Sequence, residues 1–472
     1  MIFTTIEFVV FFVVFLLGAI FLKSRINLYK WYLLLGSLIF YGYAGVHLLY
    51  LLAFVIIINY LLTLLINSAV KKKVKPGLSK LTLVLAILVN IFILIYFKYG
   101  NFISNQLLTL NETVKLPFPV PIIELYITIG LSYYIFKVIA HHVDFYKGII
   151  RLPSFLDYSV YLSFFPQVLM GPIQKPILFY RELNSSLRYN YDISQIIVRI
   201  FSGILKKLVI ASFLFEIATV TFYNPVEFSR WDLIISVFAY GAMLFADFSG
   251  YSDFSVALSN ILGFTGVENF NAPYKAIGFK DFWSRWHISL SQWFKEYVYT
   301  PLVGNRCGTI RKYLNLFITM VVSGVWHGVG FTFLIWGAYH GICSIVSHML
   351  NNVQIENIVY KKILKVIAWF STLLGVHIGW IFFASRSIDS AFDFIKTIFK
   401  PIVFTSQLID IRVIALIILV ILGNFYGHKV EKFFVASLKK IKFLTIIIIL
   451  IVTYVLLELG PDLVAPFVYF SF

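Results

Sequence analysis

Charged side chains are scarce in this sequence. Of its 472 residues only 13% are charged, whereas 60% are hydrophobic and 18% are aromatic. A soluble globular protein carries about 25% charged residues, so a soluble protein is excluded. Apolar runs of about 20 residues, the length that crosses a bilayer, recur from end to end. We predict an all-α polytopic membrane protein, with about 11 transmembrane helices plus re-entrant and interfacial helices around a central funnel.

Cysteine is nearly absent, since Cys307 and Cys343 are the two in the chain. They form neither a disulfide framework nor the spacing of a metal site, so we expect both thiols to be free and no metal to be bound. The apolar run at 2–22 has no basic segment before it and no small-residue cleavage site after it, which indicates a retained helix rather than a signal peptide. Because we find no repeat and no linker, we predict one membrane-embedded domain over 1–472.

Acidic residues are too few to balance the basic ones, and the formal net charge is +17. Such a charge occurs in nucleic-acid-binding proteins, but in a membrane protein Lys and Arg collect in cytoplasmic loops. We therefore expect no nucleic-acid partner. The expected surroundings are the lipid bilayer, and the expected location is the inner or plasma membrane, which the chain crosses several times.

The apolar runs, and the basic clusters between them, predict the order of the helices. Prolines and glycines interrupt 159–180, which indicates a re-entrant or broken segment. We expect 100–121 to be an outward loop, and 385–407 is a short mixed segment whose basic residues fit this topology poorly. Helices are expected at 5–22, twice within 31–69, and at 81–98, 122–145, 196–218, 232–264, 313–350 (a hairpin), 363–384, 411–427 and 443–460.

A compact polar island interrupts the apolar run at 232–264. It contains Asp247, Ser249 and Asp253. One interpretation is a buried hydrogen-bond network at a helix break, and the other is the lining of a tunnel for a donor or acceptor molecule.

The segment 271–306 combines aromatic and basic residues. Asp281 is a plausible N-cap for a helix that starts at Phe282, and its three tryptophans would then lie on one side, which is typical of a helix at the membrane interface. Arg285, His287 and Arg306 would make its cytoplasmic surface positive. Such a surface suits the phosphates of an anionic cofactor, and anionic lipid head groups are the alternative.

Two histidines stand in the apolar stretch 323–341. His327 is flanked by Gly324, Gly328 and Gly330, which weaken helix continuity and allow a close approach. Ionisable groups inside membranes are functional candidates. We interpret His327 as a catalytic base, and the alternative is a buried, hydrogen-bonded core residue. The second histidine, His340, lies roughly 220° round a straight helix from the first, so joint action requires a break between them.

Several motifs together carry a resemblance. They are DFSGYSDFSVALSNILGF, NFNAPYKAIGFKDFWSRWHISLSQWFKEYVYTPLVGNR and VSGVWHGVGFTFLIWGAYHG, with FFPQVLMGPI and the terminal FVYFSF in support. With these stretches the chain resembles the membrane-bound O-acyltransferases, in the bacterial branch that includes the alginate and peptidoglycan O-acetylation components. It departs from the pattern at Phe331, where relatives often carry Trp, and at Val303, where Gly is usual.

The resemblance implies that His327, in the WHG triplet, is the catalytic histidine and that His287 is its partner region. It implies that acetyl comes from cytoplasmic acetyl-CoA, with no tightly bound cofactor, and is exported to an extracytoplasmic polysaccharide of the peptidoglycan, alginate or cellulose type. It further implies a secreted or membrane-anchored second acyltransferase that completes the transfer. Candidates for the donor site or tunnel lining are Arg285, Asn305, Arg306, Trp326, His340, Asp247, Ser249 and Asp253.

Acyl transfer to a hydroxyl needs a base and a group that stabilises the oxyanion. Burial disfavours the charged form of an imidazole, which suits His327 as the base, and a positioned base typically contributes roughly 10²–10⁴-fold. The oxyanion donors are either the backbone N–H groups of Gly328 and Gly330 or the side chain of Asn305, and the sequence does not choose between them.

The C-terminal Tyr469 prompts a further hypothesis. It belongs either to an aromatic belt or to the chemistry, as a transient acyl carrier, because a phenol with a pKa near 10 makes an ester that passes its acyl group on easily. Related systems are thought to use a C-terminal tyrosine in this way, as the resemblance implies.

Two other functions compete with acetyl transfer. D-alanyl transfer to teichoic acid is the rival within the same class, and PLVGNR and Tyr469 favour acetyl transfer over it. A transporter or flippase without chemistry is the rival from another class, but transporters more often show internal repeats, which this sequence lacks.

Overall fold

The structure is a computed structural model in which every regular element among the described residues is a helix. The described residues are 1, 3–71, 76–115, 125, 128–185, 192–304, 308–350, 358–400, 406, 408–441, 443, 446–447, 450–451 and 454. This confirms the predicted all-α class. The chain divides into two compact units, Met1–Asn190 with Leu258–Val267 (unit 1) and Tyr191–Ala257 with Glu268–Phe472 (unit 2).

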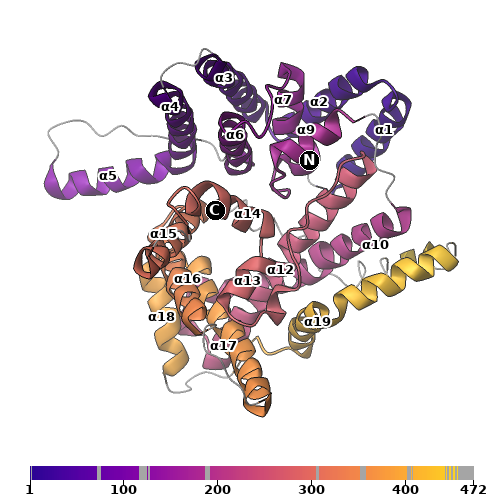
Figure 1. Cartoon of the computed structure of the whole chain (residues 1–472). Helices are drawn as coiled ribbons and strands as arrows, with labels where there is room; N and C mark the ends of the chain where they lie inside the picture. The colour runs from indigo at the N-terminus through magenta and orange to yellow at the C-terminus, as the bar shows by residue number, and fades with distance from the viewer. Residues whose placement is uncertain are drawn as a thin grey trace. The chain divides into compact units, whose positions relative to one another are not determined.

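Unit 1 contains the helices of the N-terminal part (Figure 1). The predicted pair within 31–69 is confirmed, since the chain turns at 43–45, although the first helix of the pair begins earlier, at Ile26. The helices are α1 (Ile6–Leu22), α2 (Ile26–Gly42), α3 (Val46–Lys71), α4 (Pro76–Leu94), α5 (Gly100–Val114), α6 (Leu131–Tyr146), α7 (Phe155–Ser163), α8 (Phe165–Val168) and α9 (Pro176–Leu183), with a π-helical turn η1 (Ile95–Tyr99) before α5.

The predicted break at 159–180 is confirmed, since this segment contains the end of α7, the single turn α8 and the start of α9. Its polar groups are satisfied by neighbours in unit 1. The buried Lys137 of α6 donates to the carbonyl oxygen of Tyr161 at 2.6 Å, and Gln167 donates to Gln174 at 2.8 Å. Gln174 in turn donates to Glu182 at 3.0 Å. The backbone N–H of Phe165 donates to the hydroxyl of Ser37 at 3.1 Å, and the hydroxyl of Tyr161 donates to the carbonyl oxygen of Gln174 at 3.1 Å. Broken backbone is therefore tolerated here, because side chains replace missing helical partners.

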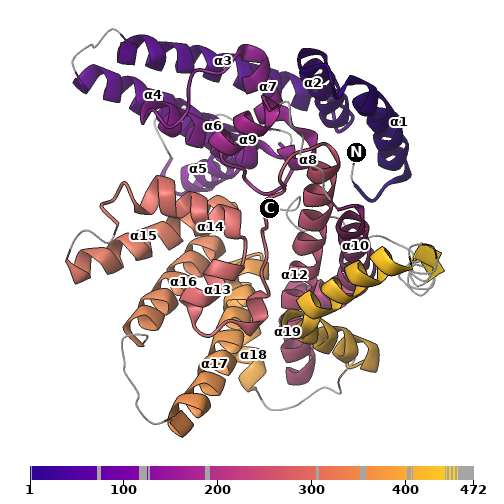
Figure 2. The ribbon, with the colours of Figure 1, turned by 45° about the vertical axis from the view of Figure 1, so that its right-hand side comes forward.

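Unit 2 contains the remaining helices, including the hairpin that carries His327 (Figures 1 and 2). They are α10 (Ile193–Ile204), η2 (Leu205–Ala211), α11 (Ser212–Tyr223), η3 (Pro225–Glu227), α12 (Arg230–Ile261, of which the last turn belongs to unit 1), η4 (Pro273–Lys275), α13 (Phe279–Arg285), α14 (Ile288–Phe294), η5 (Lys295–Tyr299), α15 (Thr309–His327), α16 (Phe331–Leu350), α17 (Ile358–Ala384), α18 (Ile388–Phe399) and α19 (Ile411–Lys440).

Several predicted boundaries are wrong. The expected loop 100–121 is helical over α5, whose apolar positions are spaced among polar ones and so do not form a hydrophobic run. The mixed segment 385–407 contains α18, and α19 continues well past the expected end at 427. The helix expected from 122 begins at Leu131, after a glycine with a φ of +80°.

Six helical segments of the described chain are long and apolar enough to cross a membrane. They are Val46–Val70, Gly77–Val114, Arg230–Ile261, Phe331–Leu350, Ile358–Ala384 and Ile411–Lys440, and the shorter Ile6–Leu22 is also apolar. A multi-pass membrane protein is thereby supported. The expected total of about 11 spans, the topology and the single-domain count stay predictions.

Candidate active site

The hairpin of α15 and α16 is held together by glycine at the crossing point. A Cβ atom on Gly324 would lie 2.3 Å from the carbonyl oxygen of Phe333, and one on Gly337 would lie 2.6 Å from that of Met320. Any larger residue at either position would force the helices apart, since real Cβ atoms do not approach so closely. The predicted break lies between the helices, at Gly328–Gly330, so this part of the sequence-based hypothesis is confirmed.

His327 is the last residue of α15, and its side chain is buried, with 3% of the residue exposed. Aromatic rings surround the imidazole: the centroid distances are 4.9 Å to Trp326, 5.1 Å to Trp336 and 5.5 Å to Phe383. The next residue, Gly328, is extended, and a Cβ there would lie 2.1 Å from a ring carbon of Phe333. The WHG glycine therefore makes room for an aromatic ring beside the histidine.

His287 lies between α13 and α14 in a left-handed conformation, with a φ of +43°. Its Nδ1 lies 3.1 Å from the Oδ1 atom of Asn269, which also accepts hydrogen bonds from the backbone N–H and the hydroxyl of Ser289. Since Oδ1 only accepts, Nδ1 carries the proton, and the neutral ring presents Nε2 as its basic nitrogen. The ring packs edge-on against Phe248 of α12 at 4.6 Å and lies 6.5 Å from Trp326.

Asn269 is a residue that sequence reasoning missed. Its side chain is buried, and its backbone carbonyl accepts from the N–H of Ile288 at 2.9 Å. The strand-like pairing that brings it beside His287 joins positions 18 residues apart, so no local spacing reveals it. No local signal singles it out, because the segment 267–271 reads VENFN and contains a second asparagine two residues later.

His340 is fully buried in α16 and is walled by aromatic rings. Its centroid lies 4.7 Å from that of Trp336 and 5.2 Å from that of Trp283. Trp336 thus contacts both hairpin histidines, which the sequence predicted to meet only if the helix breaks. Within the described residues, no hydrogen-bond partner reaches either nitrogen of His340 or the indole N–H group of Trp336. These buried groups suit a polar guest molecule, because unsatisfied buried donors and acceptors are costly.

The polar island is stabilised by opposite charges. Lys207 forms an ion pair with Asp247, both almost fully buried, and Lys206 pairs with Asp253 at 2.7 Å. The predicted helix break is wrong, because α12 is continuous and the irregular element is the π-helical turn η2, which carries both lysines. Ser249 is buried on the same helix, and its hydroxyl has no partner among the described residues. The ion pairs support the interpretation as a buried polar network, while tunnel lining stays a prediction.

The helix start and the single continuous helix expected within 271–306 are also wrong. Asp281 is not an N-cap: α13 begins one turn earlier, after Gly278 at a φ of +89°, and the Asp281 carboxylate accepts from the N–H of Ile277. Because the chain breaks at His287, the tryptophans do not share one exposed face, and Trp286 and Trp293 are buried.

Arg285 is held by its own neighbours, donating to Asp281 at 2.7 Å and to the carbonyl oxygen of Asn271 at 3.2 Å. Val303, where the family pattern has Gly, has a φ of +76°, a strained conformation for a β-branched residue. Asn305, Arg306, Cys307 and Tyr469 lie outside the described residues, whereas Cys343 is a free cysteine.

The structure thus brings together His287, Trp326, His327 and His340 around shared aromatic rings in unit 2. Within the part of the chain that the structure describes, no group of three or more His, Cys, Asp or Glu side chains could hold a metal ion. The site offers imidazole, indole and backbone groups, which suit proton transfer and hydrogen bonding.

The chain is similar to several known acyltransferases. The chain is 33% identical over 372 residues to the probable alginate O-acetylase AlgI of Pseudomonas aeruginosa, covering 78% of this chain and 69% of that protein. It is 31% identical over 396 residues to the peptidoglycan O-acetyltransferase of Helicobacter pylori, covering 78% and 73%. The teichoic acid D-alanyltransferase of Bacillus subtilis is 30% identical over 230 residues, covering 45% and 57%. The sequence pattern of the MBOAT, membrane-bound O-acyltransferase family, matches residues 38–384, and the chain belongs to this family of O-acyltransferases.

Proposed function

We propose that this O-acyltransferase takes acetyl from cytoplasmic acetyl-CoA and delivers it across the membrane for O-acetylation of an extracytoplasmic polysaccharide. The observation that carries the proposal is the buried group of His327, Trp326 and His287. The ring centroid of Trp326 lies 4.9 Å from that of His327 and 6.5 Å from that of His287. Two imidazoles in a water-poor, aromatic setting suit general acid–base catalysis, because burial favours the neutral, basic form.

In the proposed reaction a hydroxyl oxygen attacks the thioester carbonyl, and His327 takes the hydroxyl proton. The C–S bond breaks as the C–O bond forms, and the imidazolium returns the proton to the leaving thiolate, which gives an acetyl ester and free CoA. The N–H groups of Gly328 and Gly330 are candidates for the oxyanion donors. The indole N–H of Trp336 is a further candidate, since its ring contacts His327 and its nitrogen is buried without a partner among the described residues.

His287 is assigned a supporting role, in binding the donor or orienting the reacting hydroxyl. Its link to Asn269 supports this assignment, because it fixes which ring nitrogen faces the site. The left-handed backbone at His287 is a further argument, since strained non-glycine residues concentrate at functional sites.

The acceptor is proposed from the relatives, whose names specify alginate and peptidoglycan. A secreted or membrane-anchored acyltransferase would complete delivery, with Tyr469 as the transient acyl carrier. D-alanyl transfer is the second candidate, supported by a shorter match. Full acetylation in cells that carry Tyr469→Phe would contradict the carrier role alone.

The test uses purified protein with acetyl-CoA labelled in the acetyl group, and it measures release of free CoA. We expect release by the wild type and loss with His327→Ala. His348→Ala in the same hairpin is the matched control and should behave like the wild type. Equal release by the wild type and His327→Ala would overturn the proposal, and transfer from a D-alanyl carrier protein but not from acetyl-CoA would favour the second candidate.

A further inference from the structure

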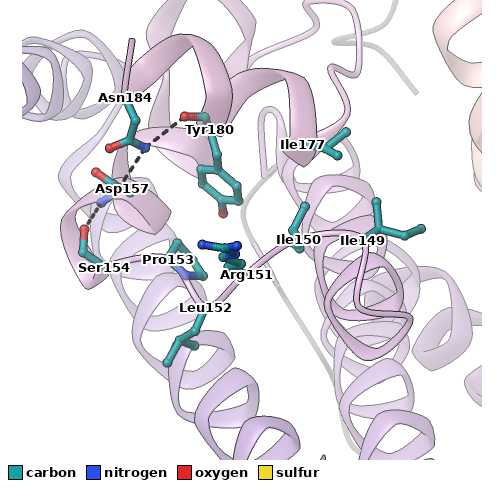
Figure 3. Close-up of a pocket in the computed structure, with 10 residues that line it drawn as sticks. All are labelled: Ile149, Ile150, Arg151, Leu152, Pro153, Ser154, Asp157, Ile177, Tyr180 and Asn184. Atoms are coloured by element: carbon teal, nitrogen blue, oxygen red, sulfur yellow. Dashed lines mark hydrogen bonds between the residues drawn. The ribbon is translucent and has the colours of Figure 1, made fainter. Parts of the chain in front are cut away.

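Unit 1 contains a cavity whose lining residues all lie outside the histidine hairpin. It has a volume of about 280 Å³ and is lined by the loop after α6, the start of α7 and the helix α9. Figure 3 shows the ten lining residues as a ring of side chains. They are Ile149, Ile150, Arg151, Leu152, Pro153, Ser154, Asp157, Ile177, Tyr180 and Asn184.

The cavity carries one uncompensated positive charge. The acidic residue of the lining is Asp157. Its carboxylate forms an ion pair with the buried Lys30 at 2.7 Å and accepts a hydrogen bond from the side-chain amide of Asn184 at 3.3 Å. Arg151 is an exposed residue, and no ion pair or hydrogen bond joins its guanidinium to a described residue. In Figure 3 this guanidinium ends near the hydroxyl end of Tyr180, inside the ring of lining residues. The site therefore favours an anion that a guanidinium can grip with two parallel hydrogen bonds.

The rim of the cavity is aliphatic and exposed. Ile149 is 47% exposed and Ile177 is 40% exposed, and Leu152 and the adjoining Phe155 are also accessible. Exposed aliphatic side chains of this kind suit contact with lipid acyl chains. A charged cavity with an apolar rim suits an amphiphile whose anionic head enters while its chains lie along the rim.

We propose that this cavity binds the phosphate group of an anionic phospholipid, through Arg151. The volume lies near the lower end of the roughly 300–1,000 Å³ typical of ligand pockets, which suits a head group rather than a nucleotide. The loop carries Lys147 as well as Arg151, so we expect it on the cytoplasmic side, where the leaflet is rich in anionic lipid. The proposal does not depend on acyl transfer.

The test is native mass spectrometry of the full-length, detergent-purified protein, titrated with phosphatidylglycerol or with phosphatidylcholine of the same acyl chains. We expect phosphatidylglycerol to be retained preferentially and Arg151→Gln to weaken its binding about tenfold, as for loss of one charge-assisted contact. Arg151→Lys should keep part of the affinity, because lysine keeps the positive charge but cannot form the two parallel hydrogen bonds of a guanidinium. Arg181→Gln, an exposed arginine of the same unit outside the cavity, is the control and should bind like the wild type.

The outcomes separate the possible ligands. Equal retention of the two lipids, or an unchanged affinity in a folded Arg151→Gln protein, overturns the proposal. Displacement of phosphatidylglycerol by millimolar inorganic phosphate, or by CoA, also overturns it, because the site would then select a free phosphate. If Arg151→Gln elutes as an aggregate, Ile177→Glu provides the second variant: a carboxylate at the rim should repel the anionic lipid alone, and unchanged binding would contradict the proposal.

Discussion

Two buried polar clusters in unit 2 look alike in sequence and differ in structure. On α12, Asp247 and Asp253 face lysines from η2, so each charge has a partner. On α16, His340 and Trp336 are more deeply buried than Asp253, yet their nitrogens have no partner among the described residues. The charges of the first arrangement are paired within the protein, whereas the second has donors and acceptors that no described residue satisfies. A polar residue in an apolar run is therefore diagnostic of chemistry only when its partners are known.

The largest effect should come from His327→Gln, which keeps a polar side chain but removes the base. We expect acetyl-transfer activity to fall about 10²–10⁴-fold while the thermal unfolding midpoint stays near that of the wild type. The measurement is CoA release beside a thermal unfolding curve. A drop in stability that matches the drop in activity would place His327 with the structural cluster instead.

The ion pair on α12 should show the reverse pattern. Lys207→Met leaves Asp247 buried without its main counter-charge, which should cost about 3–5 kcal/mol of unfolding free energy. The double variant Lys207→Met/Asp247→Leu should recover most of that loss, because both charges are gone. Activity per folded molecule should change little in the double variant; a large loss in well-folded protein would mean that the pair takes part in chemistry.

Asn269 tests how the second histidine is oriented. Asn269→Leu removes the acceptor of the His287 Nδ1–H group. The activation free energy of the reaction should rise by about 1–3 kcal/mol, which lowers activity. Asn269→Asp keeps the acceptor and adds a negative charge, which favours the charged imidazole. The neutral base would then be populated only at higher pH, so the acid limb of the pH–rate profile should move to higher pH. An unmoved profile in an active Asn269→Asp enzyme would argue that His287 does not titrate in the reaction.

The smallest effect is expected at His340. His340→Phe fills the aromatic cage without polar atoms, so stability should hold or rise slightly. Activity should fall a few-fold if the ring nitrogens bind a substrate or water in the reaction path. This corresponds to an increase of about 1 kcal/mol in the activation free energy. Measuring kcat and KM separately distinguishes a lost binding contact, which raises KM, from a lost contribution to the chemical step. Unaltered kinetics would assign His340 to packing.

The sequence predicted the break beside His327 because glycine acts locally, and the structure has it at Gly328–Gly330. It could not predict Asn269, whose role depends on pairing with a distant segment. The N-cap at Asp281 failed because Gly278, with its positive φ, starts the helix sooner. The prediction that three tryptophans lie on one side of a single helix failed because His287, in a left-handed conformation, divides that helix in two. Periodicity arguments assume continuous helices, so they fail where the backbone is unusual.

The glycine contact between Gly324 and Gly337 restricts how this enzyme can move. The backbones of α15 and α16 are in direct contact at these glycines, with no side chains between them. A shift of one helix along the other would therefore break this contact. The hairpin is a fixed wall for the imidazole of His327. We therefore expect motion near His327 to be confined to the segments packed against the hairpin, such as α13, while the imidazole keeps its place.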